Sequence, residues 1–338
     1  MYRTEKALVP ELQHFLDRVS EEDLFSGAIL VARHGEVLFK AAYGMASKGY
    51  AVNNGTDTKF NLGSMNKMFT AVTIAHLAEQ GIVNVEEVVG KYLPDFPSRL
   101  SQITVHQLLT HTSGMGTYWN DKYIASIARI KSVKDYTRLF IEDPLLFEPG
   151  AKWEYSNAGY IVLGAIIESV TGKDYFEVVK EVVYKPAHMF NTDCYDLEYD
   201  VPNLAIGYTR YGVEDKGVWR NNLFLHVVKG GPAGGGYSTV EDLFNFDIAI
   251  RGNKLLGSEW TERVTRGKVE LTADFKYGYG FGEKTLKGER IIGHNGGFPG
   301  ISSTLNMYMN SGYTLAVMSN YDNGAILVEE KFNELLLG

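Results

Sequence analysis

An apolar run that begins directly after a lysine constrains the fold of this chain more than any other feature. From Met68 to Ala78 almost every residue is apolar, and Gly81 follows shortly after. A helix that is apolar on all sides belongs inside a domain, and a glycine just past the last turn is typical of a helix end. Gly63-Ser64 is a good N-cap pair and marks the predicted start of this buried helix.

Lys67 is out of place in the first turn of that helix. The helix dipole favours anions there, and a capping box would place Glu or Gln at such a position. A lysine held away from water should have a lowered pKa, which would let it act as a base. Ser64 lies three residues earlier on the same helix face, so the pair predicts a nucleophile beside a base.

The Ser-x-x-Lys spacing carries little weight by itself. With 17 serines and 21 lysines in 338 residues, about one match is expected by chance, and Ser64/Lys67 is the only one. The simpler alternative is a serine that caps the helix and a lysine that extends to water.

Tyr155-Ser156-Asn157 is a second candidate segment. It follows the turn at Pro149-Gly150 and immediately precedes an apolar helix predicted for residues 158–170. That position would fix the side chains at a helix entrance, although Ser156 or Asn157 could serve only as a cap. Because the chain has no Gly-x-Ser-x-Gly segment, a lysine or tyrosine base is favoured over a Ser-His-Asp triad.

The segment 291–300 is a third candidate, in which apolar strand residues lead into His294-Asn295-Gly296-Gly297. Glycines let a backbone approach a ligand closely. His294 could therefore contact a leaving group or a developing oxyanion, and the Gly297 N–H could be an oxyanion donor. A single histidine at a strand end is more often structural, but the neighbouring glycines favour a site.

The pattern of the remaining elements favours an α+β fold. An amphipathic helix is predicted at 5–21, a hairpin at 27–43, strands at 277–284, 289–293, 302–309 and 313–319, and a last helix at 325–336. Residues between these ends are mainly helical. We therefore expect a sheet domain from residues 1–60 and 200–338, an all-α domain from residues 61–199, and an active site in the cleft between them.

Charge and composition exclude several classes of function. The net charge of −8 argues against nucleic acid or an anionic membrane as the main partner. Cys194 is the only cysteine, so no internal disulfide forms, and the eight histidines show no metal-ligand spacing. No apolar run of 18 residues exists, and Met1–Glu22 lacks the apolar core of a signal peptide. We expect a cytoplasmic protein, unless a leader has been removed, without metal or cofactor.

Taken together, these segments resemble the serine β-lactamases and penicillin-binding-protein-like hydrolases, nearest to the class C and esterase/D-aminopeptidase branch. Phe60-x-x-Gly-Ser64-x-x-Lys67 matches the nucleophile motif, Tyr155-Ser156-Asn157 the second motif, and His294-Asn295-Gly296 takes the place of the Lys-Thr-Gly strand motif. Supporting blocks are Leu108–Gly114, Glu148–Gly150, and Pro232-Ala-Gly-Gly with Ser238-Thr239 and Asp242-Leu243.

The resemblance implies an antiparallel sheet flanked by the N- and C-terminal helices, with an all-α domain across the cleft. It also implies that Ser64 forms an acyl-enzyme and that Lys67 and Tyr155 share proton transfer. Asn157 would orient Lys67 and the substrate, and the N–H groups of Ser64 and Gly297 would form the oxyanion hole.

One departure from the family pattern concerns the substrate. The third-motif lysine, which often binds a substrate carboxylate, is His294 in this chain. Because a neutral imidazole binds carboxylates poorly, small uncharged acyl esters become the first expectation. A D-stereospecific peptidase or amidase, or a weak β-lactamase, is the alternative with an amide or lactam substrate. A non-catalytic binding protein that kept the fold is the alternative of another class. A second departure is Lys185–Met189, to which we assign no chemistry.

Overall fold

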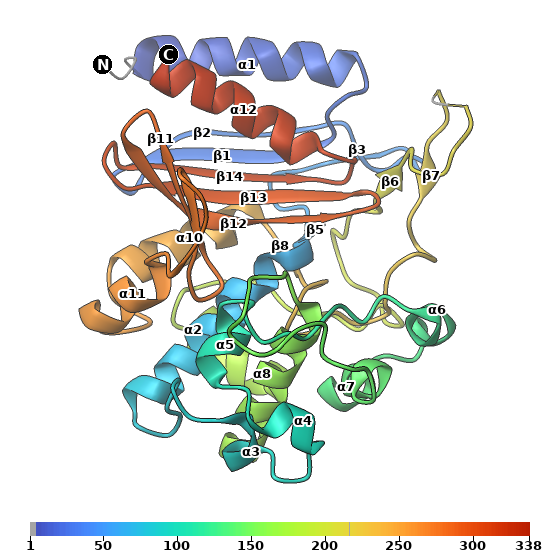
Figure 1. Ribbon diagram of the computed structural model, residues 1–338. Coiled ribbons are helices and arrows are strands. Elements are labelled where there is room, and N and C mark those ends of the chain that lie inside the picture. Colours follow the sequence, from blue (N-terminus) through green and yellow to red (C-terminus); the bar gives the residue numbers. More distant parts are fainter. Residues whose placement is uncertain (1–4, 216) are drawn as a thin grey trace.

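The structure, a computed structural model, describes residues 5–215 and 217–338. Its centre is an antiparallel sheet of eight strands (Figure 1). These strands are β1 (Gly27–Arg33), β2 (Glu36–Tyr43), β9 (Val269–Thr272), β10 (Phe275–Tyr277), β11 (Gly282–Leu286), β12 (Glu289–Phe298), β13 (Ile301–Tyr308) and β14 (Tyr313–Ser319). Across the sheet the order is β2-β1-β14-β13-β12-β11-β10-β9. The first and last segments of the chain therefore pair directly, since β1 runs beside β14.

The terminal helices α1 (Glu5–Glu21) and α12 (Gly324–Leu337) cover one face of this sheet (Figure 1). The alternation of side chains along β1 explains this layer. Ile29 and Val31 pack in the core beneath the two helices, whereas Ala28 and Leu30 belong to the core on the opposite face. A strand buried on both faces reads as a continuous apolar run, as β1 does.

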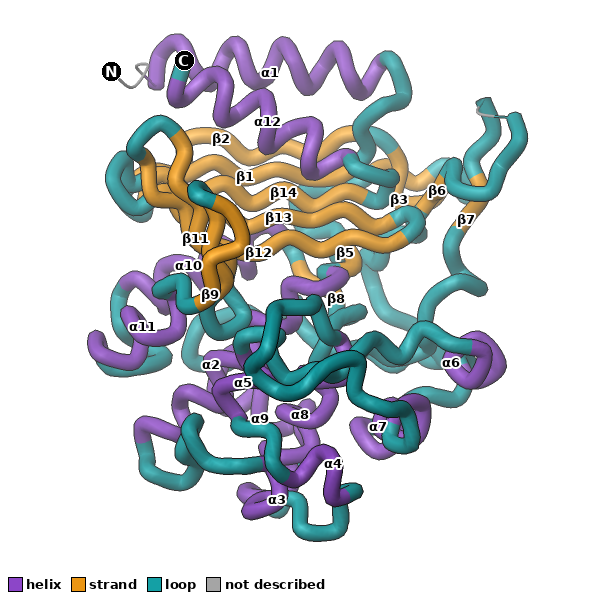
Figure 2. Tube along the Cα trace, viewed as in Figure 1, coloured by secondary structure: helices purple, strands orange, loops and turns teal. Residues whose placement is uncertain are grey.

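The other helices lie on the opposite side of the sheet, where Figure 2 shows a separate helical layer below the strands. Their bounds are α2 (Asn66–Glu79), α3 (Val89–Tyr92), α4 (Ser98–Ser101), α5 (Val105–Leu109), α6 (Asp121–Ser126), α7 (Val133–Phe140), α8 (Asn157–Thr171), α9 (Tyr175–Val179), α10 (Val240–Arg251) and α11 (Ser258–Thr265). A π-helical turn, Lys180–Tyr184, extends α9. The apolar side chains of α2 and α8 fill the larger core.

Within the described residues, three short strand pairs lie outside the main sheet. They are β3 (Met45–Ser47) with β4 (Val52–Asn53), β5 (Phe60–Asn61) with β8 (Tyr237–Ser238), and β6 (Tyr208–Thr209) with β7 (Arg220–Asn221). The β5–β8 pair joins the segment just before Ser64 to the end of the glycine-rich loop 230–236. This pair therefore fixes the entrance to the buried helix.

The α+β fold with terminal helices is confirmed, and the predicted all-round apolar helix is α2, whose residues are almost all buried. The division at residues 60 and 200 stays a prediction. Within the described ranges, no helix has the length and apolar character needed to cross a membrane.

Two local predictions were wrong. The single strand predicted at 277–284 is a hairpin, because the chain turns at 278–281 with Gly280 at φ +73° and β10 then pairs with β11. Ser64 also does not cap α2. It lies in a 3-10 turn, Gly63–Met65, and the helix begins without a side-chain cap. The strand predicted at 289–293 extends to Phe298.

Candidate active site

The Ser64 turn is held between two glycine-rich segments. Gly63 has φ +51°, and a Cβ added there would lie 2.9 Å from the backbone nitrogen of Gly297. On the other side, the N–H of Gly235 donates to the Gly63 carbonyl at 3.1 Å. Only glycine fits this left-handed position with backbone on both sides. The turn therefore presents Ser64 beside β12.

Lys67 is fully buried and makes three hydrogen bonds. Its Nζ lies 3.2 Å from Ser64 Oγ, 2.7 Å from Asn157 Oδ1 and 2.6 Å from the carbonyl oxygen of Ala233. None of these partners is a carboxylate, so nothing compensates a positive charge. Burial accordingly lowers the pKa of Lys67 well below its ordinary value. The two carbonyl oxygens only accept, so a neutral amine can turn its lone pair toward Ser64.

Tyr155 lies against both members of this pair. It is hydrogen-bonded to Ser64, and Lys67 Nζ lies 4.7 Å from the centre of its ring. Burial raises the pKa of Tyr155 above its ordinary value, while the hydrogen bond with Ser64 opposes that shift. The phenol therefore stays protonated at neutral pH.

Asn157 is the first residue of α8, and Ser156 is its N-cap. The Ser156 hydroxyl accepts from the N–H of Gly159 at 2.9 Å, so the capping role considered from sequence is present. This cap leaves the predicted role of Asn157 open, because Asn157 Oδ1 accepts from Lys67 Nζ at 2.7 Å. The cap of α8 and the contact with Lys67 therefore belong to two neighbouring residues.

The glycines of β12 allow the strand to touch the Ser64 turn. A Cβ at Gly296 would lie 1.9 Å from the carbonyl oxygen of Leu62, which is an impossible contact, whereas a Cβ at Gly297 would meet nothing within 4 Å. Gly296 thus permits the close approach, and Gly297 lines the same cavity as Ser64.

His294 lies on the Tyr155 side and does not line the cavity that contains Ser64. Its Nδ1 lies 2.6 Å from the Asn295 carbonyl and therefore carries the proton, so Nε2 accepts from the Tyr277 hydroxyl at 3.1 Å. Burial, and then the charge of Lys67, lower the pKa of His294 to about 4. The imidazole is neutral at physiological pH.

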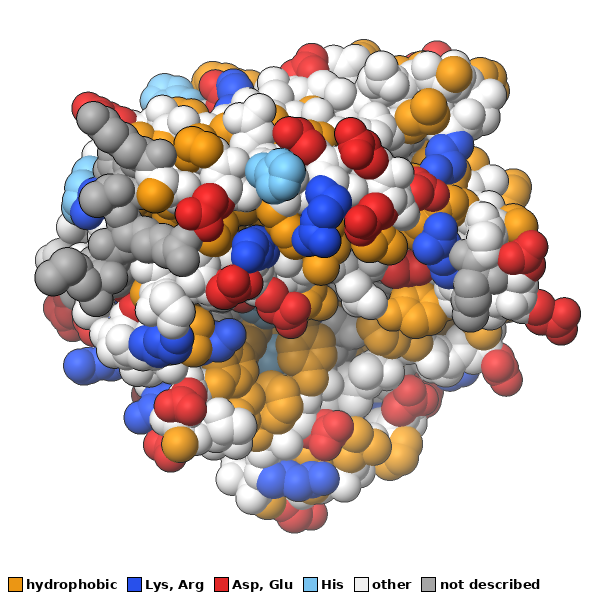
Figure 3. Space-filling view, turned by 90° about the horizontal axis from the view of Figure 1, so that it is seen from above, with side chains coloured by type: hydrophobic (Ala, Val, Ile, Leu, Met, Phe, Trp, Pro, Cys, Tyr) orange, Lys and Arg blue, Asp and Glu red, His pale blue; other side chains and the backbone are white. Residues whose placement is uncertain are grey.

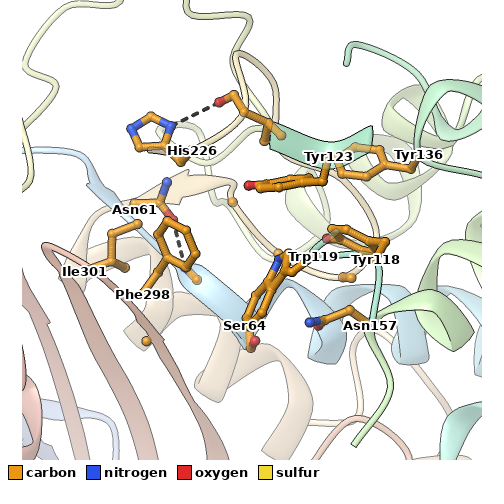
Figure 4. Close-up of a pocket in the computed structure, with 16 residues that line it drawn as sticks. Asn61, Ser64, Tyr118, Trp119, Tyr123, Tyr136, Asn157, His226, Phe298 and Ile301 are labelled. Atoms are coloured by element: carbon orange, nitrogen blue, oxygen red, sulfur yellow. Dashed lines mark hydrogen bonds between the residues drawn. The ribbon is translucent and has the colours of Figure 1, made fainter. Parts of the chain in front are cut away.

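The cavity over Ser64, called here the serine cavity, is aromatic and uncharged. Figure 4 shows tyrosines on one side, Phe298 and Ile301 on the other, and Ser64 and Asn157 at its base. Trp119 packs against Phe298 with the rings tilted by 55° and their centres 5.7 Å apart. No described residue lining this cavity is Asp, Glu, Lys or Arg, and burial lowers the pKa of His226.

A second cavity, called here the histidine cavity, is lined by Tyr155, Trp153, Tyr277 and His294, and by polar residues that include Lys284 and Glu329. None of its residues lines the serine cavity. Glu329 belongs to α12, and Figure 3, seen from the side of α1 and α12, shows a hollow with hydrophobic walls and charged side chains at its rim. The two cavities meet at the hydrogen bond between Ser64 and Tyr155.

Comparison with known proteins identifies the family of this chain. The protein-family model described as Beta-lactamase matches residues 12–336, which is nearly the whole chain and includes every segment of the site. The chain belongs to the β-lactamase family of serine hydrolases.

Several relatives of this β-lactamase-family chain are penicillin-binding proteins. Penicillin-binding protein 4* of Bacillus subtilis (strain 168) is 30% identical over 331 residues, which cover 91% of this chain and 71% of that protein. The crystal structure of a penicillin-binding protein from Bacillus halodurans superposes with a TM-score of 0.87 at 30% identity, covering 95% and 100% of the two chains. A D-amino acid amidase from Ochrobactrum anthropi SV3 shares the fold, with a TM-score of 0.83 at 22% identity and coverage of 97% and 98%.

Sequence reasoning missed three groups in this family member's site. The Ala233 carbonyl accepts from Lys67, Tyr277 donates to His294, and His111 packs against Tyr155. Ala233 and His111 lie in the supporting blocks Pro232-Ala-Gly-Gly and Leu108–Gly114, but sequence reasoning assigned neither residue a role in the site. Over residues 5–215 and 217–338, no group of three or more His, Cys, Asp or Glu side chains is arranged to hold a metal ion.

Proposed function

We propose that this protein is a carboxylesterase that hydrolyses small, uncharged acyl esters through an acyl-enzyme on Ser64. The observation that carries the proposal is the absence of any formally charged side chain among the described residues of the serine cavity. Binding an anionic substrate there would remove its hydration without a compensating cation. His294 does not supply one, because its pKa is about 4.

The first step is attack by Ser64 Oγ on the ester carbonyl carbon. The lone pair of neutral Lys67 accepts the Ser64 proton while the new C–O bond forms, and the carbonyl electrons move to oxygen. The N–H groups of Ser64 and Gly297 stabilise that oxyanion. Lys67 suits this role because its two other partners, Asn157 Oδ1 and the Ala233 carbonyl, hold its two N–H groups.

The second step expels the alcohol. The tetrahedral intermediate collapses, the C–O bond to the leaving group breaks, and Tyr155 donates its proton to the departing oxygen and regains one from Lys67. A protonated phenol between Ser64 and the histidine cavity is placed for this transfer. Water then attacks the acyl-enzyme by the same route and releases the carboxylic acid.

The second candidate is amide or lactam chemistry, either as a D-stereospecific peptidase or amidase or as a weak β-lactamase. It is favoured by the 30% identity to proteins named penicillin-binding proteins. Such a substrate would place its polar leaving group in the histidine cavity, where Lys284 and Glu329 lie.

The decisive experiment is labelling with an organophosphonate followed by intact-mass measurement. We expect one covalent adduct in the wild type and none in Ser64→Ala. Ser113→Ala is the matched control, because it removes another buried serine hydroxyl without touching Lys67. Absence of an adduct would overturn both enzymatic proposals and favour the non-catalytic binding protein.

A substrate panel then ranks the two enzymatic proposals. Short-chain nitrophenyl esters, D-alanine nitroanilide and a chromogenic cephalosporin are compared by kcat/KM. The esters are expected to be the best substrates. Turnover of the cephalosporin or anilide alone would show that the esterase proposal is wrong.

A further inference from the structure

His111 packs against Tyr155, and the proposed reaction steps do not use it. It is fully buried two residues after the end of α5 and has φ +61°, a backbone conformation that residues other than glycine rarely adopt. Such a residue persists only where its surroundings hold it, and these cases cluster at functional sites.

The backbone on both sides of Tyr155 is bonded to this one residue. The N–H of Glu154 donates to the His111 carbonyl oxygen at 2.9 Å, and the N–H of Ser156 donates to His111 Nδ1 at 3.1 Å. Between these two bonds the imidazole lies against the Tyr155 ring, with ring centres 4.3 Å apart. The left-handed backbone of His111 turns its carbonyl and its ring to the same segment.

The imidazole uses one nitrogen for this contact. Because Nδ1 accepts, the proton is on Nε2, which has no hydrogen-bond partner among the described residues. Around the ring lie the aromatic groups of Tyr155, Tyr160 and Tyr277. Burial, followed by the charges of Lys67 and His294, lowers the pKa of His111, so Nδ1 remains an acceptor through the working pH range.

We infer that His111 is the positioning residue for Tyr155. It holds the phenol next to Ser64, with the hydroxyl group directed toward the leaving group. The imidazole fixes the segment by accepting from Ser156, and it fixes the phenol ring by direct packing. Its loss would lower proton donation to the leaving group and leave the buried serine-lysine pair in place. This inference rests on the proposed proton transfer by Tyr155.

The test separates positioning from packing by varying the leaving group. His111→Phe keeps an aromatic ring and removes the acceptor, whereas His111→Asn places an amide oxygen near the position of Nδ1. For phenyl or alkyl acetates, whose leaving groups need a proton, we expect His111→Phe to lower the acylation rate about 100-fold. For p-nitrophenyl acetate, a good leaving group, the loss should be below about 5-fold. His111→Asn should restore most of the rate.

A double-mutant cycle with Tyr155→Phe gives an independent readout. In that background His111→Phe should cause no further loss on poor leaving groups, since the group it positions is gone. His106→Phe is the matched control. His106 Nδ1 is hydrogen-bonded to Tyr279 at 2.7 Å outside both cavities, so any effect should be equal for all leaving groups.

An equal loss for all leaving groups in His111→Phe, or losses that add in the cycle, would overturn the inference. If His111→Phe does not fold, His111→Gln takes its place and is compared with His111→Asn. The longer glutamine side chain lacks an acceptor at the position of Nδ1, whereas asparagine has one there. Aryl phosphonates with graded leaving groups replace the esters if the wild type hydrolyses none. Failure of the esterase proposal is then distinguished from failure of the role of His111.

Discussion

The serine cavity and the histidine cavity share a boundary and have opposite character. The first is walled by Trp119, Phe298 and buried tyrosines and has no charged side chain among its described residues. The second joins aromatic side chains to Lys284 and Glu329. Lys67 lies next to both Ser64 and Tyr155 at the boundary, and none of its hydrogen-bond partners is a carboxylate.

This difference indicates which part of the substrate each cavity would bind. An uncharged acyl group suits the serine cavity next to the proposed oxyanion donors, and a more polar leaving group suits the cavity beyond Tyr155. Because burial destabilises the protonated amine, the lysine at the boundary is available as a base. The predictions below test this division, beginning with the largest effect.

Lys67→Met removes the amine at the boundary between the cavities. We expect kcat/KM for a neutral ester to fall at least about 1,000-fold, because Tyr155, the other titratable group bonded to Ser64, has a raised pKa and stays protonated. Lys59→Met is the control, since Lys59 is also buried but donates to the Pro202 carbonyl. Equal losses in both variants would mean that burial of a lysine, and not its position, matters.

Gly296→Ala places a methyl group where the Leu62 carbonyl lies and should push β12 away from the Ser64 turn. The oxyanion donors would then separate, lowering kcat about 100-fold. Gly297→Ala should cost much less, because its Cβ enters open space and the N–H remains. Steady-state kinetics on both variants tests whether the close approach of backbone, or the glycine itself, is required.

The pH dependence identifies which group titrates. Lys67 must be neutral to accept the proton, so activity should rise about tenfold per pH unit up to its lowered pKa and then level off. This rise of activity, the acid limb of the pH profile, should lie well below pH 10.5. Because the pKa of Tyr155 is raised, its ionisation should lower activity only at high pH. His294→Asn should leave the acid limb in place. Its disappearance in that variant would assign the limb to His294.

His294→Lys introduces a cation into the histidine cavity. We expect about a 10-fold gain in kcat/KM for substrates whose leaving group carries a carboxylate, through one charge-assisted contact. Neutral esters should lose activity only slightly. A gain for neutral esters instead would contradict the assignment of this cavity to the leaving group.

Trp119→Ala opens the wall of the serine cavity. Loss of the contact with Phe298 and with the acyl group should raise KM for aromatic acyl esters about 5-fold and leave kcat nearly unchanged. Acetate esters, which are too small to reach the wall, provide the comparison. Equal changes for both ester types would show that Trp119 does not select the acyl group.

Local signals were sufficient for much of the fold. The apolar run after Lys67 predicted a buried helix, and the alternation in the last hundred residues predicted strands of the sheet. They failed at residues 277–284, because strand propensity alone does not distinguish one continuous strand from two strands joined by a tight turn. They failed also at Ser64, because a good capping residue can lie in a 3-10 turn that tertiary contacts hold.

The sequence by itself located the Ser64 motif, the tyrosine segment and the glycines of β12, because each is defined by neighbours a few residues away, whereas tertiary contacts hold the 3-10 turn around Ser64. Only the tertiary structure decided what surrounds Lys67. Its partners Asn157 and Ala233 lie 90 and 166 residues further along the chain, and neither could be assigned from spacing. The lowered pKa of Lys67 depends on those distant neutral groups and on the exclusion of water. The same packing places His294 beyond Tyr155. It also brings His111 into contact with the Tyr155 ring and with the backbone of Ser156.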